Sequence, residues 1–249
     1  MEIKVDWGGK LCRINLERGV DLSIPFIVEF QQVNCFFAPF TADQPVKAET
    51  FTGSVASGGS VNFYNHFLNF HGGGTHTECY GHISEARESV NRVLREYLGM
   101  AILISVYPTL RPDGDRVIEE TTLRVLLQGQ QPTPFLVLRT LPNETAKQQR
   151  HYSGTNPPYL SGEAAKWIAS MGFRHLLVDL PSVDRESDGG KLAAHRAFWS
   201  ERRKEECTIT ELIYVPEGVR DGHYFINLQL APIHSDAAPS RPVLFEVEV

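Results

Sequence analysis

The sequence lacks the features of disulfide-rich, nucleic-acid-binding and membrane-spanning proteins. Its four cysteines are far apart among 249 residues and form no CxxC pair, so we expect reduced thiols rather than a disulfide framework or zinc ribbon. Lys and Arg total 24 against 30 Asp and Glu, and the net charge of −6 predicts no nucleic-acid binding. No apolar run reaches the ~18 residues of a spanning helix or resembles a signal segment. We therefore predict a cytoplasmic protein without membrane or nucleic-acid partners.

Several motifs of nucleotide-binding and hydrolytic proteins are also missing. The chain contains neither GxGxxG after a strand nor GxxxxGK[ST], which argues against a nucleotide cofactor. It contains no GxSxG elbow, and Ser182 lies in a proline-containing turn that is typical of a structural residue rather than a nucleophile. The sequence has no repeat of 20 to 50 residues, which excludes solenoids and propellers.

The remaining pattern predicts a mixed α/β (α+β) fold in a single domain over residues 1–249. Hydrophobic residues make up 42% of the chain, enough for a sizeable core. Apolar, β-branched runs predict strands at 101–106, 135–139, 175–180, 208–215, 224–230 and 242–249. Helical spacing predicts helices at 119–128, capped by Thr121 or Thr122, at 162–172, capped by Ser161, and at 191–205.

The first seventy residues give weaker structural signals. Gly8-Gly9 between two alternating segments predicts a hairpin, because this pair can adopt the positive φ of a tight turn. Residues 20–70 are rich in aromatics and interrupted by prolines, and we expect the Gly/Ser run at 53–60 to be a loop within the domain.

Candidate metal ligands are concentrated in the segment HGGGTHTECYGH, residues 71–82. It holds His71, His76 and His82 with Glu78 among them. Imidazole nitrogen and carboxylate oxygen bind zinc, manganese or iron, and a bound ion can lower the pKa of its water to about 7. The segment therefore predicts a metal centre for hydrolysis.

Spacing suggests how these side chains could converge. His76, Glu78 and His82 occupy even positions, so an extended segment would turn them to one face. The glycines at 72–74 allow unusual torsions and close approach, which could bring His71 in through a bulge. The alternative is a glycine-rich turn with ordinary surface or packed histidines. Cys79 has the opposite parity, so we expect a small buried hydrophobe.

The chain resembles the cyclase family, or bacterial kynurenine formamidase-like metal hydrolases, whose signature reads HxGTHxDxPxH. Gly74-Thr75-His76 and His82 match this signature. The similarity continues in VDLSIPF at 20–26, DLPSVD at 179–184, His195-Arg-Ala-Phe and Thr210-Glu211-Leu212, and so spans most of the chain.

The resemblance implies the fold, the ligands and the chemistry of the site. A central mixed sheet or barrel-like β core would be flanked by helices, and His82 would act as general base or acid. One or two divalent ions, zinc or manganese, would be held by His71, His76, Glu78, His195 and Glu211. The family also implies a homodimer or homotetramer.

The chain departs from the signature at two points. His71 lies three residues before Gly74, whereas the family histidine lies two before this glycine. Either the extra glycine loops out and His71 still binds, or this ligand is lost and the site holds fewer or weaker metals. Glu78 replaces aspartate and Tyr80 replaces proline, so the backbone would have to compensate for one added methylene.

Two functional hypotheses follow. In the first, metal-activated water attacks a small-molecule amide, an N-formyl aryl amine or a cyclic aryl amide, and His82 passes a proton to the leaving nitrogen. The aromatic segment 61–70 would line the pocket or simply pack in the core. In the second, the two departures leave a weak or inactive metal-binding or regulatory protein on the same scaffold.

Overall fold

The computed structural model describes the chain except for residues 29, 201–202 and 249. Its central feature is a sheet with the strand order β1-β2-β16-β15-β8-β11-β13-β14-β7. Strand β7 also pairs with β16, so that seven strands from β16 to β7 close into a barrel-like core. This arrangement confirms the predicted mixed α/β fold with a barrel-like β core.

The strands of the main sheet come from all parts of the chain. Their bounds are β1 Glu2–Trp7, β2 Lys10–Asp21, β7 His76–Glu78, β8 Leu98–Val106, β11 Phe135–Thr140, β13 His175–Val178, β14 Thr208–Glu211, β15 Gly222–Leu230 and β16 Ala237–Glu248. Strands β8, β11, β13 and β14 run parallel, and the other pairs are antiparallel. The four parallel strands therefore end at the same edge of the sheet.

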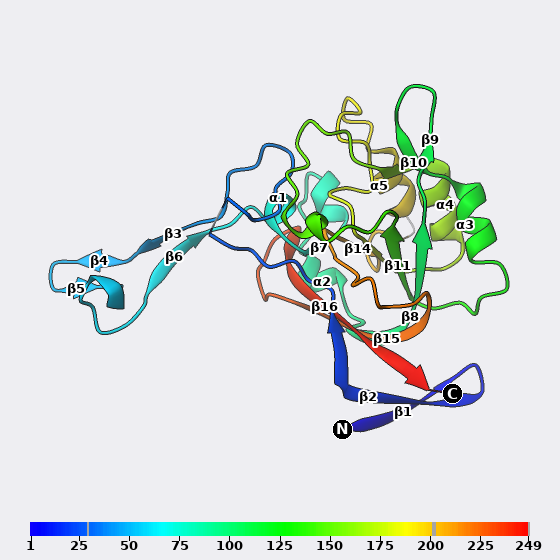
Figure 1. Cartoon of the computed structure of the whole chain (residues 1–249), viewed down its shortest axis with the longest axis horizontal. Helices are drawn as coiled ribbons and strands as arrows, with labels where there is room; N and C mark the ends of the chain where they lie inside the picture. The colour runs from blue at the N-terminus through cyan, green and yellow to red at the C-terminus, as the bar shows by residue number, and fades with distance from the viewer. Residues whose placement is uncertain (29, 201–202, 249) are drawn as a thin grey trace.

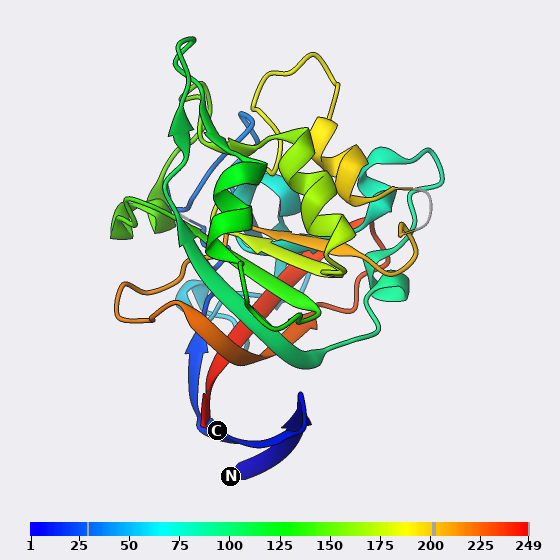
Figure 2. The ribbon, with the colours of Figure 1, turned by 90° about the vertical axis from the view of Figure 1, so that its right-hand side faces the viewer.

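Alternation along the parallel strands separates two apolar clusters. In β11, Leu136 and Leu138 face the helices, whereas Phe135 and Val137 face the barrel interior. All four side chains are buried, as expected for strands covered on both faces. The helices α3 Glu120–Leu126, α4 Gly162–Ser170 and α5 Ala193–Phe198 cover the outer face (Figure 2).

The helix predictions are confirmed in position and corrected in their ends. Ser161 caps α4 as expected, because its hydroxyl accepts a hydrogen bond from the backbone N–H of Ala164 at 3.1 Å. Helix α3 begins after Glu119, so neither predicted threonine is its cap. The predicted helix at 191–205 is shorter, since α5 ends at Phe198, and two of its predicted residues, 201–202, lie outside the described part.

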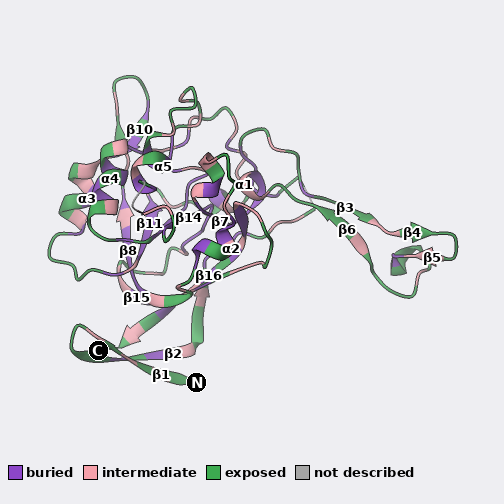
Figure 3. Ribbon diagram, turned by 180° about the vertical axis from the view of Figure 1, so that it is seen from behind, coloured by how far each residue is buried: buried purple, intermediate pink, exposed green. Residues whose placement is uncertain are grey.

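The amino-terminal hairpin is confirmed, and Gly8 and Gly9 have φ values of 62° and 78° in its turn. In the segment that follows, the sequence predicted only a loop at 53–60, and the structure forms an arm that projects from the body (Figures 1 and 3). Its elements are β3 Ala42–Pro45, β4 Lys47–Ala48, β5 Phe51–Thr52, the 3-10 helix η1 Val55–Ser57 and β6 Tyr64–Phe67. No described apolar residue between 42 and 68 is buried.

Short elements complete the fold between these parts. They are α1 Phe70–Gly73, η2 Tyr80–Ile83, α2 Val90–Val93, β9 Thr109–Leu110, β10 Arg116–Ile118, η3 Thr145–Gln149 and β12 Tyr159–Leu160. No helix in the described part of the chain has both the length and the apolar character needed to cross a membrane.

Candidate metal centre

Two neighbouring strands supply the first ligand candidates. In the antiparallel register of β7 and β14, His76 lies opposite Glu211, so both side chains project from the same face. Nε2 of His76 is 3.6 Å from Oε2 of Glu211. Thr77 and Thr210 point to the other face, where their hydroxyls are 2.8 Å apart. The pairing of these strands therefore brings together two predicted ligands that are far apart in sequence.

The hydrogen bonds of His76 fix which nitrogen is free. Nδ1 lies 3.0 Å from the carbonyl oxygen of Gly74, and since a carbonyl only accepts, Nδ1 carries the proton. Nε2 then presents a lone pair, and it is buried without a hydrogen-bond partner among the described residues. A buried lone pair facing carboxylates costs free energy unless a proton or cation satisfies it.

His195 enters the site from α5 and is held by Asp184. The carboxylate of Asp184 accepts from the backbone N–H groups of Ala194 and His195 at 2.7 and 3.1 Å and contacts Nδ1 of His195 at 2.6 Å. Nε2 of His195 therefore faces inward, 3.0 Å from Oε1 of Glu78. A carboxylate behind the imidazole is a common support for a metal-binding histidine.

His71 reaches the cluster despite its shifted position. The extra glycine forms no bulge, because residues 70–73 make the single helical turn α1, capped by Asn69. Nδ1 of His71 lies 3.1 Å from Oε2 of Glu78. Gly72 is required for close approach rather than for its torsions, because a Cβ there would lie 2.3 Å from Cβ of Ala38.

His82 joins the cluster by a different route from the one predicted. It lies on η2 and not on an extended strand, so the parity argument fails beyond Glu78. Nδ1 of His82 is 3.7 Å from Oε2 of Glu78 and 3.6 Å from Oδ2 of Asp236. Its side chain is 31% exposed, whereas that of Glu78 is fully buried. His82 thus lies between the buried Glu78 and the solvent.

Sequence reasoning missed Asp236 as a member of the site. This residue directly precedes β16, and its Oδ2 lies 3.2 Å from Nε2 of His71. Its backbone carbonyl accepts from the N–H of Cys79, which fixes it beside the histidine segment. No local motif marks it, and only the pairing of β16 with β7 brings it here. Asp184, in contrast, was part of the quoted DLPSVD motif but had no role assigned.

Charges in the cluster shift the pKa values of two imidazoles, those of the partly exposed His71 and the buried His195. Burial alone would lower the pKa of His71, but hydrogen bonds to Asp236 and Glu78 raise it to about 10. For His195 the bonds to Asp184 and Glu78 likewise outweigh burial and raise its pKa to about 10. Burial would raise the pKa of Glu78, but His82, His195 and His71 hold it well below its usual value.

Overlapping groups of these side chains could hold a cation. Each has three donor atoms within 4.8 Å of one another, and the groups are His71, His76 and Glu78; Glu78, His82 and His195; and His71, His82 and Asp236. The nitrogen and oxygen donors suit zinc or manganese. Cys79 is not among them, because it is buried and bonds through Sγ to the carbonyl of Glu88, which confirms the prediction that it packs as a small hydrophobe.

A cavity of about 540 Å³ opens beside the cluster. His71, His82, His195 and Glu211 line its polar side, and an apolar side is formed by residues 36–39 with Leu192. Phe36 and Phe37 both have positive φ, 57° and 52°, a conformation that is strained for bulky side chains. The predicted aromatic segment 61–70 contributes only Asn69 to this lining.

Comparison with known proteins gives a consistent result. The family model described as "Putative cyclase" matches residues 20–185. A kynurenine formamidase of Bacillus thuringiensis (strain Al Hakam) is 30% identical over 216 residues, which cover 86% of this chain and 94% of that relative.

Solved structures share the fold at lower identity. A predicted metal-dependent hydrolase from Bacillus stearothermophilus has a TM-score of 0.65 at 18% identity, covering 92% of this chain and 98% of that one. Isatin hydrolase A from Labrenzia aggregata has a TM-score of 0.67 at 14% identity, covering 93% and 94%.

Proposed function

The chain belongs to the cyclase family, and from this premise we propose that it is a metal-dependent hydrolase of an amide C–N bond in an N-formyl aryl amine. One observation carries the proposal. The buried atom Nε2 of His76 has no hydrogen-bond partner among the described residues, and it lies in one donor group with His71 and Glu78. The relative named kynurenine formamidase supports the substrate class.

The donor set fits one or two divalent ions, and we propose zinc or manganese. Glu78 directs Oε1 toward His195 and Oε2 toward His71, so its two oxygens serve the two halves of the cluster. His71 and His76 would complete one half, and His195 with Glu211 the other. Oε1 of Glu211 is held by the backbone N–H of Val183 at 2.9 Å. When bound, such an ion acidifies a water molecule and polarises a carbonyl group.

We assign the proton transfer to His82. Its imidazole lies at the cavity, and rings of His71 and His195 are 4.3 and 5.6 Å from its own, centroid to centroid. Amide hydrolysis requires a proton on the departing nitrogen, which a nearby imidazole can deliver near neutral pH. The apolar side formed by Phe36 and Phe37 would hold the aryl group and exclude water from it.

A direct test combines metal content with turnover. Protein purified with added zinc or manganese is analysed for bound metal and assayed with formanilide, with acetanilide as a bulkier amide and isatin as a cyclic one. We expect stoichiometric metal, loss of activity with a chelator, and preference for the formyl amide. A metal-free and inactive preparation after loading would instead support the alternative of an inactive scaffold.

We also propose that the chain functions as a homodimer or homotetramer. The arm carries exposed apolar side chains, among them Phe63 at 57% and Phe67 at 58% exposure, and has no buried apolar residue. An extended hairpin without a core is stabilised by packing against another surface. A second copy of the chain is the occupant we propose, in keeping with the symmetric assemblies usual for soluble enzymes.

A further inference from the structure

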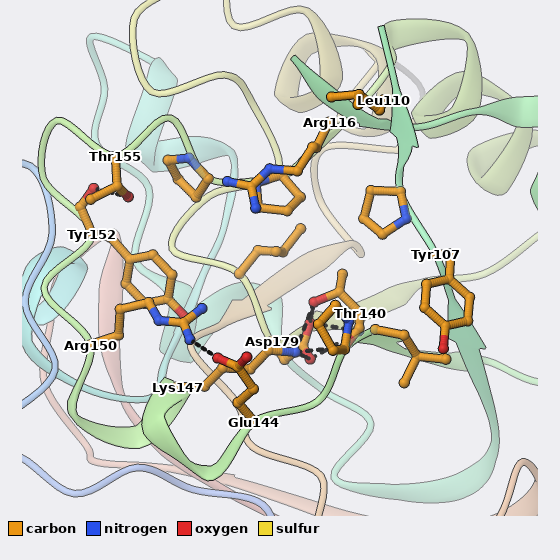
Figure 4. Close-up of a pocket in the computed structure, with 16 residues that line it drawn as sticks. Tyr107, Leu110, Arg116, Thr140, Glu144, Lys147, Arg150, Tyr152, Thr155 and Asp179 are labelled. Carbon is orange, nitrogen blue, oxygen red and sulfur yellow. Dashed lines mark hydrogen bonds and ion pairs between the residues drawn. The ribbon is translucent and has the colours of Figure 1, made fainter. Parts of the chain in front are cut away.

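A second cavity, of about 470 Å³, lies at the carboxyl ends of the parallel strands β8, β11 and β13 (Figure 4). Tyr107 follows β8, Thr140 ends β11 and Asp179 follows β13. Among the described residues it shares no lining side chain with the metal-centre cavity. Its size and its place at this edge of the sheet are those of ligand sites in proteins with parallel strands.

The floor of this cavity is a buried ion pair whose charges cancel. Nζ of Lys147 lies 2.7 Å from Oδ2 of Asp179 and also donates to the carbonyl and hydroxyl of Thr140. The carboxylate of Asp179 accepts in addition from the backbone N–H and hydroxyl of Thr140. Since every polar group of the pair is satisfied within the protein, the floor is rigid and has no net charge for a ligand.

The walls add one further neutral pair and one unpaired cation. Arg150 and Glu144 form an ion pair at 2.5 Å. Arg116 extends its guanidinium group across the cavity toward the side on which Thr155 lies (Figure 4). Its one hydrogen bond in the described structure is to the carbonyl oxygen of Asn156, at 3.2 Å. Among the charged lining residues, Arg116 alone has no carboxylate partner within the described part of the chain, and this leaves the lining with one net positive charge.

The rest of the lining is mainly apolar, and part of it is exposed to solvent. Pro108, Leu141 and Leu180 lie in the lining, and Tyr107 and Leu110 are 69% and 72% exposed. The hydroxyl of Tyr152 has no hydrogen-bond partner among the described residues, and burial raises its pKa, which keeps it a donor. Exposed apolar side chains around a hollow favour a ligand with an apolar body.

We propose that this cavity binds a small organic monocarboxylate with an aromatic or other apolar body. Arg116 holds the carboxylate, because a guanidinium group matches its two oxygens. Tyr107, Leu110 and the prolines contact the apolar body. The site is separate from the metal centre and is occupied whether or not metal is bound.

Calorimetry with benzoate as the probe and benzamide as its neutral counterpart tests this site. Arg116→Gln removes the cation, and Leu110→Asp adds a negative charge at an exposed position of the rim. Both should weaken benzoate binding about tenfold or more. Arg116→Gln should leave the weaker benzamide binding unchanged, whereas Leu110→Asp should weaken it as well, because Leu110 contacts the apolar body of either ligand. Arg18→Gln, on the distant strand β2, is the matched control and should bind benzoate like the parent protein.

The metal centre could itself bind benzoate, so each titration is repeated after chelation and with His76→Ala. Binding that survives both changes and is lost in Arg116→Gln supports the second site. Binding that disappears with the metal and is unaffected by Arg116→Gln overturns the proposal. So does equal affinity for benzoate and benzamide, or no detectable binding of benzoate at millimolar concentration.

Discussion

Glu78 and His195 meet across 117 residues of sequence, with Oε1 of the carboxylate 3.0 Å from Nε2 of the imidazole. The first lies on a strand that closes the barrel, and the second lies on a helix that packs outside it. Their contact joins the two halves of the ligand cluster at one fully buried carboxylate. The candidate metal centre therefore depends on the packing of α5 as much as on the histidine segment.

Replacement of Glu78 by glutamine is expected to weaken metal binding more than it destabilises the fold. The amide keeps the shape of the side chain but loses the charge that both halves of the cluster share. We expect metal content to fall by at least half and kcat to fall about a hundredfold or more. Metal analysis and steady-state kinetics check this result, and Glu85→Gln at a nearby exposed position is the control. Full metal occupancy in Glu78→Gln would contradict the shared-ligand arrangement.

Replacement of His82 by asparagine separates proton transfer from metal binding. His82 is farther from Glu78 than His195 is, 3.7 Å against 3.0 Å, and its side chain is partly exposed. We expect metal content to stay near that of the parent protein while kcat falls roughly 100- to 10,000-fold. If the variant loses its metal, His82 is a ligand rather than the proton carrier.

The metal-free protein should lose stability as the pH rises. The pKa values of His71 and His195 are raised from 6.5 to about 10 by their carboxylate partners. The folded chain therefore binds protons that the unfolded chain releases, and this contribution is complete below pH 6.5 and lost as the pH passes 10. Thermal unfolding of chelated protein across this range should show a falling midpoint.

Zinc-loaded protein provides the comparison for that experiment. A cation on these imidazoles replaces the bound protons, so its stability should not fall over the same pH range. Calorimetric titration of zinc into metal-free protein should accordingly release protons, which buffers of different ionisation enthalpy detect. Parallel pH profiles for both forms would show that the two histidines do not respond to the metal.

The sequence predicted the barrel core well because its strands are buried on both faces. The runs at 101–106, 135–139 and 175–180 fall on β8, β11 and β13. Their apolar character needs no knowledge of partners. The run at 208–215 was less accurate, because β14 ends at Glu211 and the chain turns at Leu212 with a φ of 54°. Residues after this turn are buried by packing outside the strand, so the sequence shows no change of periodicity where β14 ends.

The candidate site was predictable where it is local and unpredictable where it depends on packing. His76 and Glu78 share a strand, so their common face followed from alternation. Asp236 lies close to His71 only because β16 and β7 pair in the folded barrel, and the local sequence gives no sign of this contact. The arm was missed for a related reason, since exposed aromatics such as Phe63 read in sequence as core residues.

The arm offers the clearest test of assembly. Phe63 and Phe67 are exposed on it, and Phe67 pairs with Ala42, the first residue of β3. The double variant Phe63→Asp and Phe67→Asp places two charges on this surface, where burial in an interface would be costly. We expect light scattering to show a smaller assembly, with circular dichroism unchanged because neither side chain is in the core. Leu11→Asp, on the exposed side of the amino-terminal hairpin, is the matched control and should keep the parent mass. If Leu11→Asp dissociates the assembly and the double variant does not, the hairpin rather than the arm forms the contact between copies.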